Sequence, residues 1–181
     1  MLALCTGLRR GELFALRWRH FDPEAGAISI VEAVYDHIID VPKTKNSFRT
    51  VPLPKLVVQW LNQWRSRTKY GKPDDFILAG RKGIPGDHAR LLRDYIKPSC
   101  EDLGIPPATW LTFRRTWATW ADGKGITPKM RGELIGHSAE TNEQIYTKVL
   151  PDTLRDVVEI VGIGDRSELV TDCSLVLNSV N

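Results

Sequence analysis

The sequence lacks several features that would place it in specialised protein classes. Its 181 residues contain no run of about 18 apolar residues, so we expect no transmembrane helix. It has only three cysteines, which are odd in number and far apart, so reduced thiols are expected instead of a disulfide framework or a zinc site. Arg9 and Arg10 follow the short apolar opening, the wrong order for a secretory signal. With 42% hydrophobic and 26% charged residues, wholesale disorder is also excluded.

The charge of the chain is unevenly distributed. The formal net charge is only +3, but residues 43–98 contain 13 lysines and arginines against four acidic residues, a local net charge of +9. Residues 150–181 contain two basic and six acidic residues, a net charge of −4. A concentrated basic segment is a solvated surface in many proteins, but it is also typical of proteins that bind a polyanion.

The hydrophobic pattern predicts a mainly α fold with a small antiparallel β-sheet. Three short β-branched segments are expected as strands, with residues 43–47 as the hairpin that joins the last two. Their ranges are 27–31, 38–41 and 49–53. Helical spacing and capping signals predict helices over most of the remaining chain. Their ranges are 8–18, 54–69, 87–103, 110–122, 128–135, 141–150 and 152–161.

Four motifs follow one another along the chain, and each alone is a weak signal. Together and in this order they resemble the catalytic domain of tyrosine recombinases, the phage integrase family, over residues 2–160. They are Thr6-Gly-Leu-Arg-Arg-Gly-Glu-Leu13, Pro42-Lys-Thr-Lys-Asn-Ser-Phe-Arg-Thr-Val-Pro-Leu53, Leu111-Thr-Phe-Arg-Arg-Thr-Trp-Ala-Thr119, and Leu134-Ile-Gly-His-Ser138 with Tyr146 nine residues after its histidine.

The resemblance implies the DNA breaking-rejoining fold and a reaction that uses no metal or other cofactor. In that reaction a tyrosine attacks a DNA phosphodiester, forms a 3′-phosphotyrosyl bond and releases a 5′-hydroxyl. A phenol is a poor nucleophile at neutral pH, so it needs a positioned, electropositive setting. Two arginines can bind the charge of the transition state, and a lysine can donate a proton to the leaving oxygen.

Matching the motifs residue by residue implies the site. The implied catalytic residues are Arg9, Lys43, Arg114, His137 and Tyr146. Glu12 resembles the acidic residue that supports the first arginine. The implied contacts to DNA are Arg10, Lys45, Ser47, Arg49 and Arg115. For Ser47, Arg49 and Arg115 a structural role is an equal alternative, and the other tyrosines and histidines match no family motif.

The lysine and the third motif need separate comment. Lys45 lies two residues after Lys43, on the same face of an extended chain, and is its main rival; the Pro-Lys-Thr context favours Lys43. The third motif usually begins with a histidine, and this chain has Leu111 there. Leucine cannot donate, accept or transfer a proton, so we expect activity lower by about 10²-fold or more if that group acts as acid or base.

The expected organisation is one catalytic domain, residues 1–161, and a tail, residues 162–181, that packs on a neighbouring subunit or is disordered. The chain opens inside an apolar, helix-favouring run without an N-cap, so we expect an N-terminal truncation and no preceding core DNA-binding domain. Double-stranded DNA and further copies of the protein, as a tetramer on paired sites, are the expected partners. A cytoplasmic location in a bacterium, or encoded by a phage, follows from the resemblance.

Three functions remain open from the sequence. The first is a DNA breaking-and-joining recombinase that acts in integration, with weak or absent activity for the chain alone. The second is a non-catalytic DNA-binding or regulatory remnant of a prophage integrase, which is favoured by Leu111 and by the expected N-terminal truncation. The third is nicking activity similar to that of type IB topoisomerases, which needs no assembly.

Overall fold

The computed structural model describes residues 1–35, 38–40 and 48–136. The helices and helical turns of this part are α1 (Leu2–Thr6), α2 (Arg10–Ala15), η1 (Trp18–His20), α3 (Lys55–Arg67), α4 (His88–Leu91), η3 (Leu92–Ile96), α5 (Lys97–Asp102), α6 (Trp110–Gly123) and α7 (Pro128–Ile135). The strands are β1 (Phe21–Asp22), β2 (Ala27–Ile30), β3 (Ala33–Tyr35), β4 (Ile38–Asp40) and β5 (Arg49–Pro52). This mixture of helices with short antiparallel strands confirms the predicted fold class.

The strands form two small sheets. β1, β2 and β5 form a three-stranded antiparallel sheet in that order, in which Ile28 lies opposite Val51. β3 pairs with β4 in a separate two-stranded sheet. The predicted hairpin between β4 and β5 is therefore wrong, although the ranges of the three predicted strands agree with β2, β4 and β5 to within one residue; β1 and β3 were not predicted. The physical reason is burial. Pairing of β2 with β5 places Ile28, Ile30 and Val51 in the core, where they are fully buried, whereas every residue of β4 is exposed.

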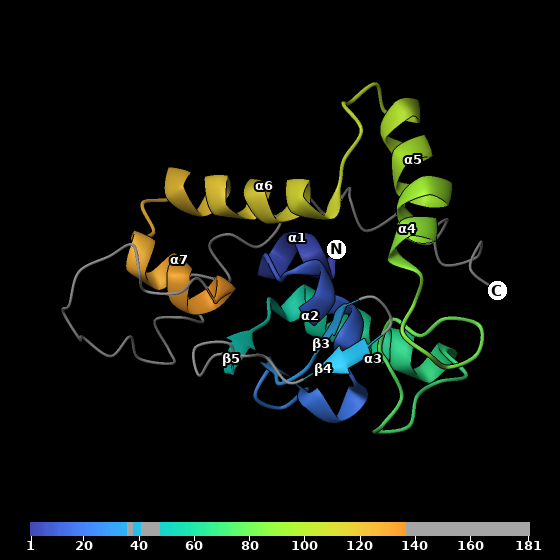
Figure 1. The fold of residues 1–181 in the computed structure, drawn as a ribbon. Coiled ribbons are helices and arrows are strands. Elements are labelled where there is room, and N and C mark those ends of the chain that lie inside the picture. Colours follow the sequence, from blue (N-terminus) through green and yellow to red (C-terminus); the bar gives the residue numbers. More distant parts are fainter. Residues whose placement is uncertain (36–37, 41–47, 137–181) are drawn as a thin grey trace.

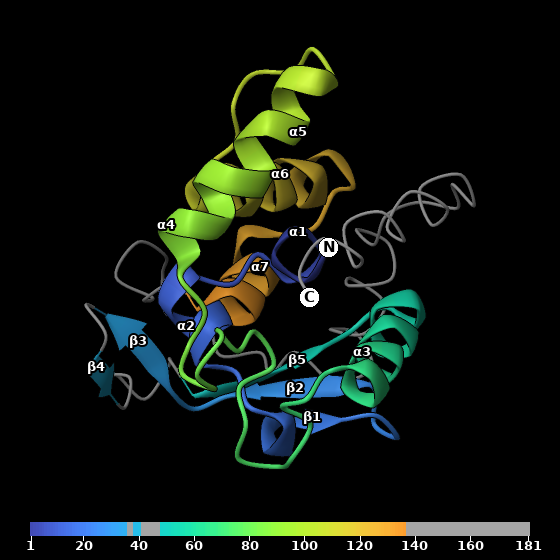
Figure 2. The same cartoon turned by 90° about the vertical axis from the view of Figure 1, so that its right-hand side faces the viewer.

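The elements stack in layers on the three-stranded sheet (Figure 2). The sheet forms one side, with α3 beside it, and α1, α2 and α7 lie between the sheet and the long helix α6. α6 runs across α1, and α4 to α5 form a separate helical arm that reaches away from the sheet (Figure 1). The middle layer therefore carries the segments that are buried from both sides.

The core of the described part is built by this middle layer. Its largest fully buried side chains include Phe14 of α2, Trp18 of η1 and Trp117 of α6. Thr6 and Glu12 of this layer and Arg114 of α6 are the buried polar or charged residues of the described part. Because a buried charge is costly unless it is paired, the surroundings of Glu12 and Arg114 require explanation.

The helix boundaries follow the local signals in the sequence. α7 begins after Thr127, whose side chain accepts a hydrogen bond from the Met130 amide, and it ends at Gly136 in the left-handed conformation. The predicted basic helix over 87–103 is observed as α4, η3 and α5, with the π-helical turn η3 just before Pro98, which has no amide hydrogen to donate. No helix of the described residues is long and apolar enough to cross a membrane. The helices predicted over 141–150 and 152–161 lie outside the described residues.

Candidate active site

Arg9 lies at the start of α2, where the chain changes from extended to helical. Its amide and its Nη1 both donate to the Glu12 carboxylate, each over 2.9 Å. Glu12 is three residues further on and thus caps the first turn while it pairs with the Arg9 side chain. The Arg9 guanidinium is held by the buried Glu12 carboxylate and still reaches solvent, because 36% of the Arg9 side chain is exposed.

Glu12 is buried and is shared by two arginines. Arg49 at the start of β5 donates to both of its oxygens, over 3.1 Å and 2.8 Å, in addition to the bonds from Arg9. Burial alone would raise the pKa of Glu12, but the hydrogen bonds and charge of Arg49, followed by the bonds from Arg9, outweigh it and keep this pKa below its usual value. The carboxylate is therefore ionised at neutral pH and orients both guanidinium groups.

Arg114 lies on α6 and is almost completely buried, with 9% of the residue exposed. Its Nη1 donates to the Gly7 carbonyl over 2.7 Å, and its Nη2 donates to the Ile135 carbonyl over 2.8 Å. Burial, followed by the charge of the nearby Arg9, lowers the pKa of Arg114 to about 10. Arg114 is still protonated at neutral pH, and a negative charge in the cleft would offset the cost of burying its charge.

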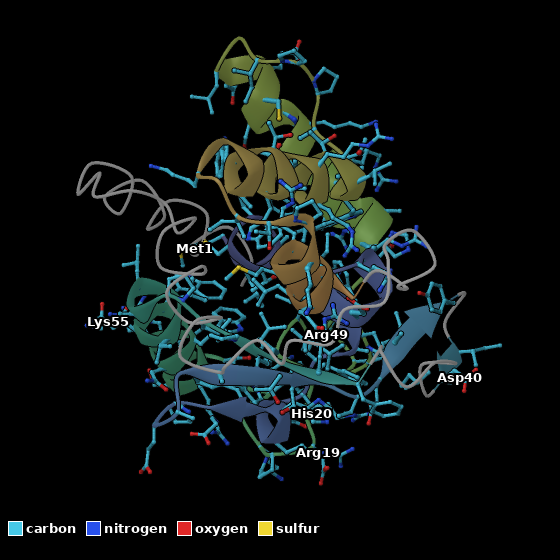
Figure 3. All side chains as sticks on the ribbon, turned by 90° about the vertical axis from the view of Figure 1, so that its left-hand side faces the viewer. Met1, Arg19, His20, Asp40, Arg49 and Lys55 are labelled. Atoms are coloured by element: carbon cyan, nitrogen blue, oxygen red, sulfur yellow. The ribbon has the colours of Figure 1, made fainter. Side chains whose placement is uncertain are left out.

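The end of α7 holds the arginines together. Three successive carbonyls accept hydrogen bonds from three different elements: Leu134 from Arg49 Nε over 2.8 Å, Ile135 from Arg114, and Gly136 from Arg9. The last carbonyls of a helix have no partner inside it and carry partial negative charge, which makes them suitable acceptors for cations. Figure 3 shows Arg49 beneath α7, above the sheet.

Arg9 and Arg114, but not Arg49, border a cleft of about 690 Å³ between α2, α4 and α6. Its polar or charged lining includes Arg9, Arg10, Arg114, Tyr35 and His88, and Leu111 also faces it. A guanidinium has five N–H donors, and contacts within the described residues occupy two each on Arg9 and Arg114. The cleft therefore presents positive charge and further donors to an anion with several oxygens, such as a phosphodiester.

Of the eleven residues implied for the site, the structure describes six, which are Glu12 and the five arginines. Arg9 and Arg114 line one cleft although they are 105 positions apart, and Arg10 is exposed at its edge. Arg49 is directed into the protein, with 8% of its side chain exposed. Its contacts therefore favour the structural role over the DNA contact that the sequence left open. Arg115 is exposed on α6. Lys43, Lys45, Ser47, His137 and Tyr146 lie outside the described residues.

Sequence reasoning missed two residues of the cleft, Tyr35 and His88. Tyr35 ends β3 and its ring lies against α2, where a Cβ on Gly11 would come within 3.2 Å of its Cζ and 2.7 Å of the Val34 carbonyl oxygen. Gly11, inside the Arg-Arg-Gly-Glu motif, is thus the one local sign that another segment approaches closely. His88 had no such sign, because its contacts are made with residues far away in the sequence.

The described residues contain no group of three or more histidine, cysteine, aspartate or glutamate side chains that could hold a metal ion. Cys5 and Cys100 are both buried, and neither belongs to a disulfide. The chemistry that the described site offers is accordingly that of guanidinium, imidazole and phenol groups.

Comparison with known proteins places these features in a family. The sequence model of the phage integrase family matches residues 1–152. The chain is 30% identical to a XerC-like tyrosine recombinase of Caldanaerobacter subterraneus, with 88% of this chain and 47% of that protein covered. It is 26% identical to tyrosine recombinase XerA of Pyrococcus furiosus, with 88% of this chain and 52% of that protein covered.

Solved structures give the same result for the fold. The integrase of the transposon Tn1549, in complex with circular intermediate DNA, superposes with a TM-score of 0.66 at 24% identity, over 87% of this chain and 57% of that one. A XerA recombinase superposes with a TM-score of 0.61 at 21% identity, over 86% of this chain and 53% of that one. The chain spans about half the length of the curated relatives it matches. By sequence and by fold, this chain belongs to the phage integrase family.

Proposed function

We propose that this chain is the catalytic domain of a site-specific DNA recombinase that cleaves and rejoins duplex DNA through Tyr146. The observation that carries the proposal is the preformed pair Arg9 and Arg114, held over one cleft by Glu12 and by the end of α7. Burial of the Arg114 charge is costly, and a non-catalytic remnant would not require it, so this arrangement favours a working site.

The proposed reaction uses the cleft as the site of the scissile phosphate. Arg9 and Arg114 bind its non-bridging oxygens and stabilise the charge that accumulates on them in the transition state. The Tyr146 phenol oxygen forms a bond to phosphorus as the bond to the 5′-oxygen breaks, and its proton is lost to a base. Lys43, with Lys45 as the alternative, donates a proton to the departing 5′-oxygen, and His137 contacts the same phosphate.

The chain itself offers a reason to place His137 here. It directly follows Gly136, whose carbonyl accepts a hydrogen bond from Arg9. One peptide bond therefore separates His137 from an atom held by a residue of the cleft.

The remaining expectations belong to the same proposal. Residues 1–161 form the catalytic unit and residues 162–181 form a tail that contacts another copy. Duplex DNA and further copies of the protein are the partners, with a tetramer assembled on paired sites, in the cytoplasm of a bacterium.

A nicked suicide duplex tests the proposal. A phosphotyrosyl intermediate accumulates when the short cleaved fragment diffuses away, so we expect a covalent protein–DNA adduct on a denaturing gel. The adduct should be lost in Tyr146→Phe and reduced by about 10²-fold or more in Arg114→Ala. Salt-sensitive duplex binding without any adduct would support the non-catalytic remnant instead.

A further inference from the structure

The cleft is lined by a histidine, His88, that is not among the catalytic residues implied by the family motifs. His88, the first residue of α4, lines the cleft together with Leu111 and Arg114 of α6. It is half-buried, and its ring packs edge-on against Phe14 of α2, with ring centroids 5.9 Å apart and an interplanar angle of 69°. Among the residues that line this cleft in the described part of the chain, His88 is the one imidazole.

The backbone of His88 is tied to the start of α6. Trp110 Nε1 donates to the His88 carbonyl over 3.1 Å, and the Trp110 ring packs edge-on against the same Phe14, with centroids 5.0 Å apart. Trp110 immediately precedes Leu111 and lies four residues, about one helical turn, before Arg114. His88 is therefore fixed relative to the part of α6 that carries Arg114.

α4 also fixes where His88 enters the cleft. Asp87 precedes it and accepts hydrogen bonds from the amides of Ala89 and Arg90, each over 2.9 Å. This N-cap sets the direction of the first turn of α4, and with it the direction of the His88 side chain.

Leu111 leaves part of the α6 wall unable to form hydrogen bonds. It is 52% exposed at the cleft, one turn before Arg114, and its side chain has neither a donor nor an acceptor. A phosphodiester has two non-bridging and two bridging oxygens, and the two guanidinium groups approach from the α2 and α6 sides. A donor on α4 would come from a different element of the cleft than either arginine.

We propose that the His88 imidazole donates a hydrogen bond to the phosphodiester in the cleft, so that α4 supplies the imidazole that α6 lacks at Leu111. This inference rests on the proposed function, because the anion it needs is the DNA phosphate. It makes His88 a phosphate-contacting residue, with no covalent step of its own.

Substitution by phenylalanine and by asparagine separates hydrogen bonding from packing. His88→Phe keeps an aromatic ring against Phe14 but removes the donor, and should lower the single-turnover rate of adduct formation by about 10²-fold. His88→Asn keeps a donor and should restore at least part of this loss. Duplex affinity should change by no more than about twofold in either variant, because most of it comes from charged contacts.

His20→Gln is the matched control. It changes another half-buried histidine, on the opposite side of the sheet from Arg49 (Figure 3), and should leave the rate unchanged. Equal rates for wild type, His88→Phe and His88→Asn would overturn the inference.

Comparison of His88→Phe with a double variant tests whether an imidazole on α6 can replace the imidazole on α4. Leu111→His placed in the His88→Phe protein should recover most of the lost rate, because it restores an imidazole to the cleft. If the double variant is as slow as His88→Phe although it folds and binds duplex normally, His88 does not replace an imidazole at position 111.

One measurement does not depend on turnover. In Tyr146→Phe protein, addition of the nicked duplex should shift the imidazole ¹⁵N resonances of His88, assigned by their loss in His88→Phe, and leave those of His20 in place. With four histidines in the chain these spectra are tractable. If wild type forms no adduct, the proposed function fails while this shift still decides the inference; unshifted His88 resonances with duplex bound would overturn it.

Discussion

Glu12 is the single residue on which the geometry of the site depends most directly. It is buried, it is ionised, and it accepts hydrogen bonds from Arg9 and Arg49. Such a buried pair adds little net stability over an apolar replacement, because desolvation opposes the attraction, but removing only one partner leaves a buried charge unpaired. The consequences of its loss can therefore be predicted in both stability and activity.

Glu12→Gln should destabilise the fold by about 3 kcal/mol, because the buried Arg49 guanidinium loses the charged carboxylate that accepts hydrogen bonds from both of its Nη atoms. Urea unfolding followed by tryptophan fluorescence measures this loss. Glu24→Gln, at an exposed position, is the control and should stay within about 0.5 kcal/mol of wild type. Equal midpoints for both variants would mean that the ion pair of Glu12 with Arg49 does not contribute to folding.

The low pKa of Glu12 also predicts how stability depends on pH. Its folded pKa lies below the usual 4.5, so the folded state holds fewer protons than the unfolded state in that range. The stability it contributes is full above about pH 4.5 and is lost as the pH falls through the folded value. Unfolding free energies measured from pH 6 downward should therefore fall less steeply in Glu12→Gln than in wild type, and parallel curves would contradict this assignment.

At the scale of elements, the last turn of α7 organises the site. Leu134, Ile135 and Gly136 each accept a hydrogen bond from a different arginine, and these come from β5, α6 and the start of α2. Gly136 adopts a left-handed conformation with φ of 67°, and a Cβ there would lie 2.6 Å from Arg49 Nη1 and 3.1 Å from Arg9 Nη1. Glycine is required here both for the backbone conformation and for the space.

Gly136→Ala should therefore destabilise the protein by about 1–2 kcal/mol from its backbone conformation alone, and further by displacing the two guanidinium groups. Gly132→Ala is a matched control in the same helix: nothing lies within 4 Å of the place that its added methyl group would occupy, and it should raise stability by about 0.5–1 kcal/mol. Thermal melts of both proteins, with adduct formation as a second readout, test this. Equal effects of the two substitutions would show that the end of α7 is not tightly packed against the arginines.

The elements also show what sequence reasoning could reach. Local signals sufficed for α7, with Thr127, Pro128 and Gly136, and the ranges of β2, β4 and β5 followed from β-branched runs, whereas the short strands β1 and β3 were not predicted. The pairing of β5 with β2 in place of β4 did not follow, because register depends on which faces become buried. The bonds of Arg49 to Glu12 and Leu134 span 37 and 85 residues, a proximity that no local pattern encodes.

At the scale of the whole molecule, the positions of individual arginines matter more than the total charge. Arg9, Arg10 and Arg114 converge there, whereas Arg19 lies on the other side of the sheet (Figure 3) and is bound by Glu32 and Asp74. The net charge of +3 thus says little about the field that a DNA backbone would meet.

This arrangement predicts the salt dependence of duplex binding. A plot of log affinity against log salt concentration should have a negative slope set by the number of phosphates neutralised. Arg10→Ala should reduce that slope by about 1, and Arg19→Ala should leave it unchanged. Fluorescence anisotropy with a labelled duplex over a range of salt gives both values, and equal slopes for the two variants would remove Arg10 from the DNA surface.

The hydrogen bonds at the end of α7 connect the binding of a phosphate in the cleft with the docking of α7. Arg9 and Arg114 hold α7 by its last carbonyls and also line the cleft, and the chain beyond Gly136 leads to His137 and Tyr146. Phosphate binding to these arginines and the docking of α7 are therefore linked equilibria. The factor by which docked α7 raises phosphate affinity equals the factor by which bound phosphate raises the equilibrium constant for docking. DNA that fits the cleft would thereby favour the α7 position from which the segment with the proposed nucleophile, Tyr146, starts.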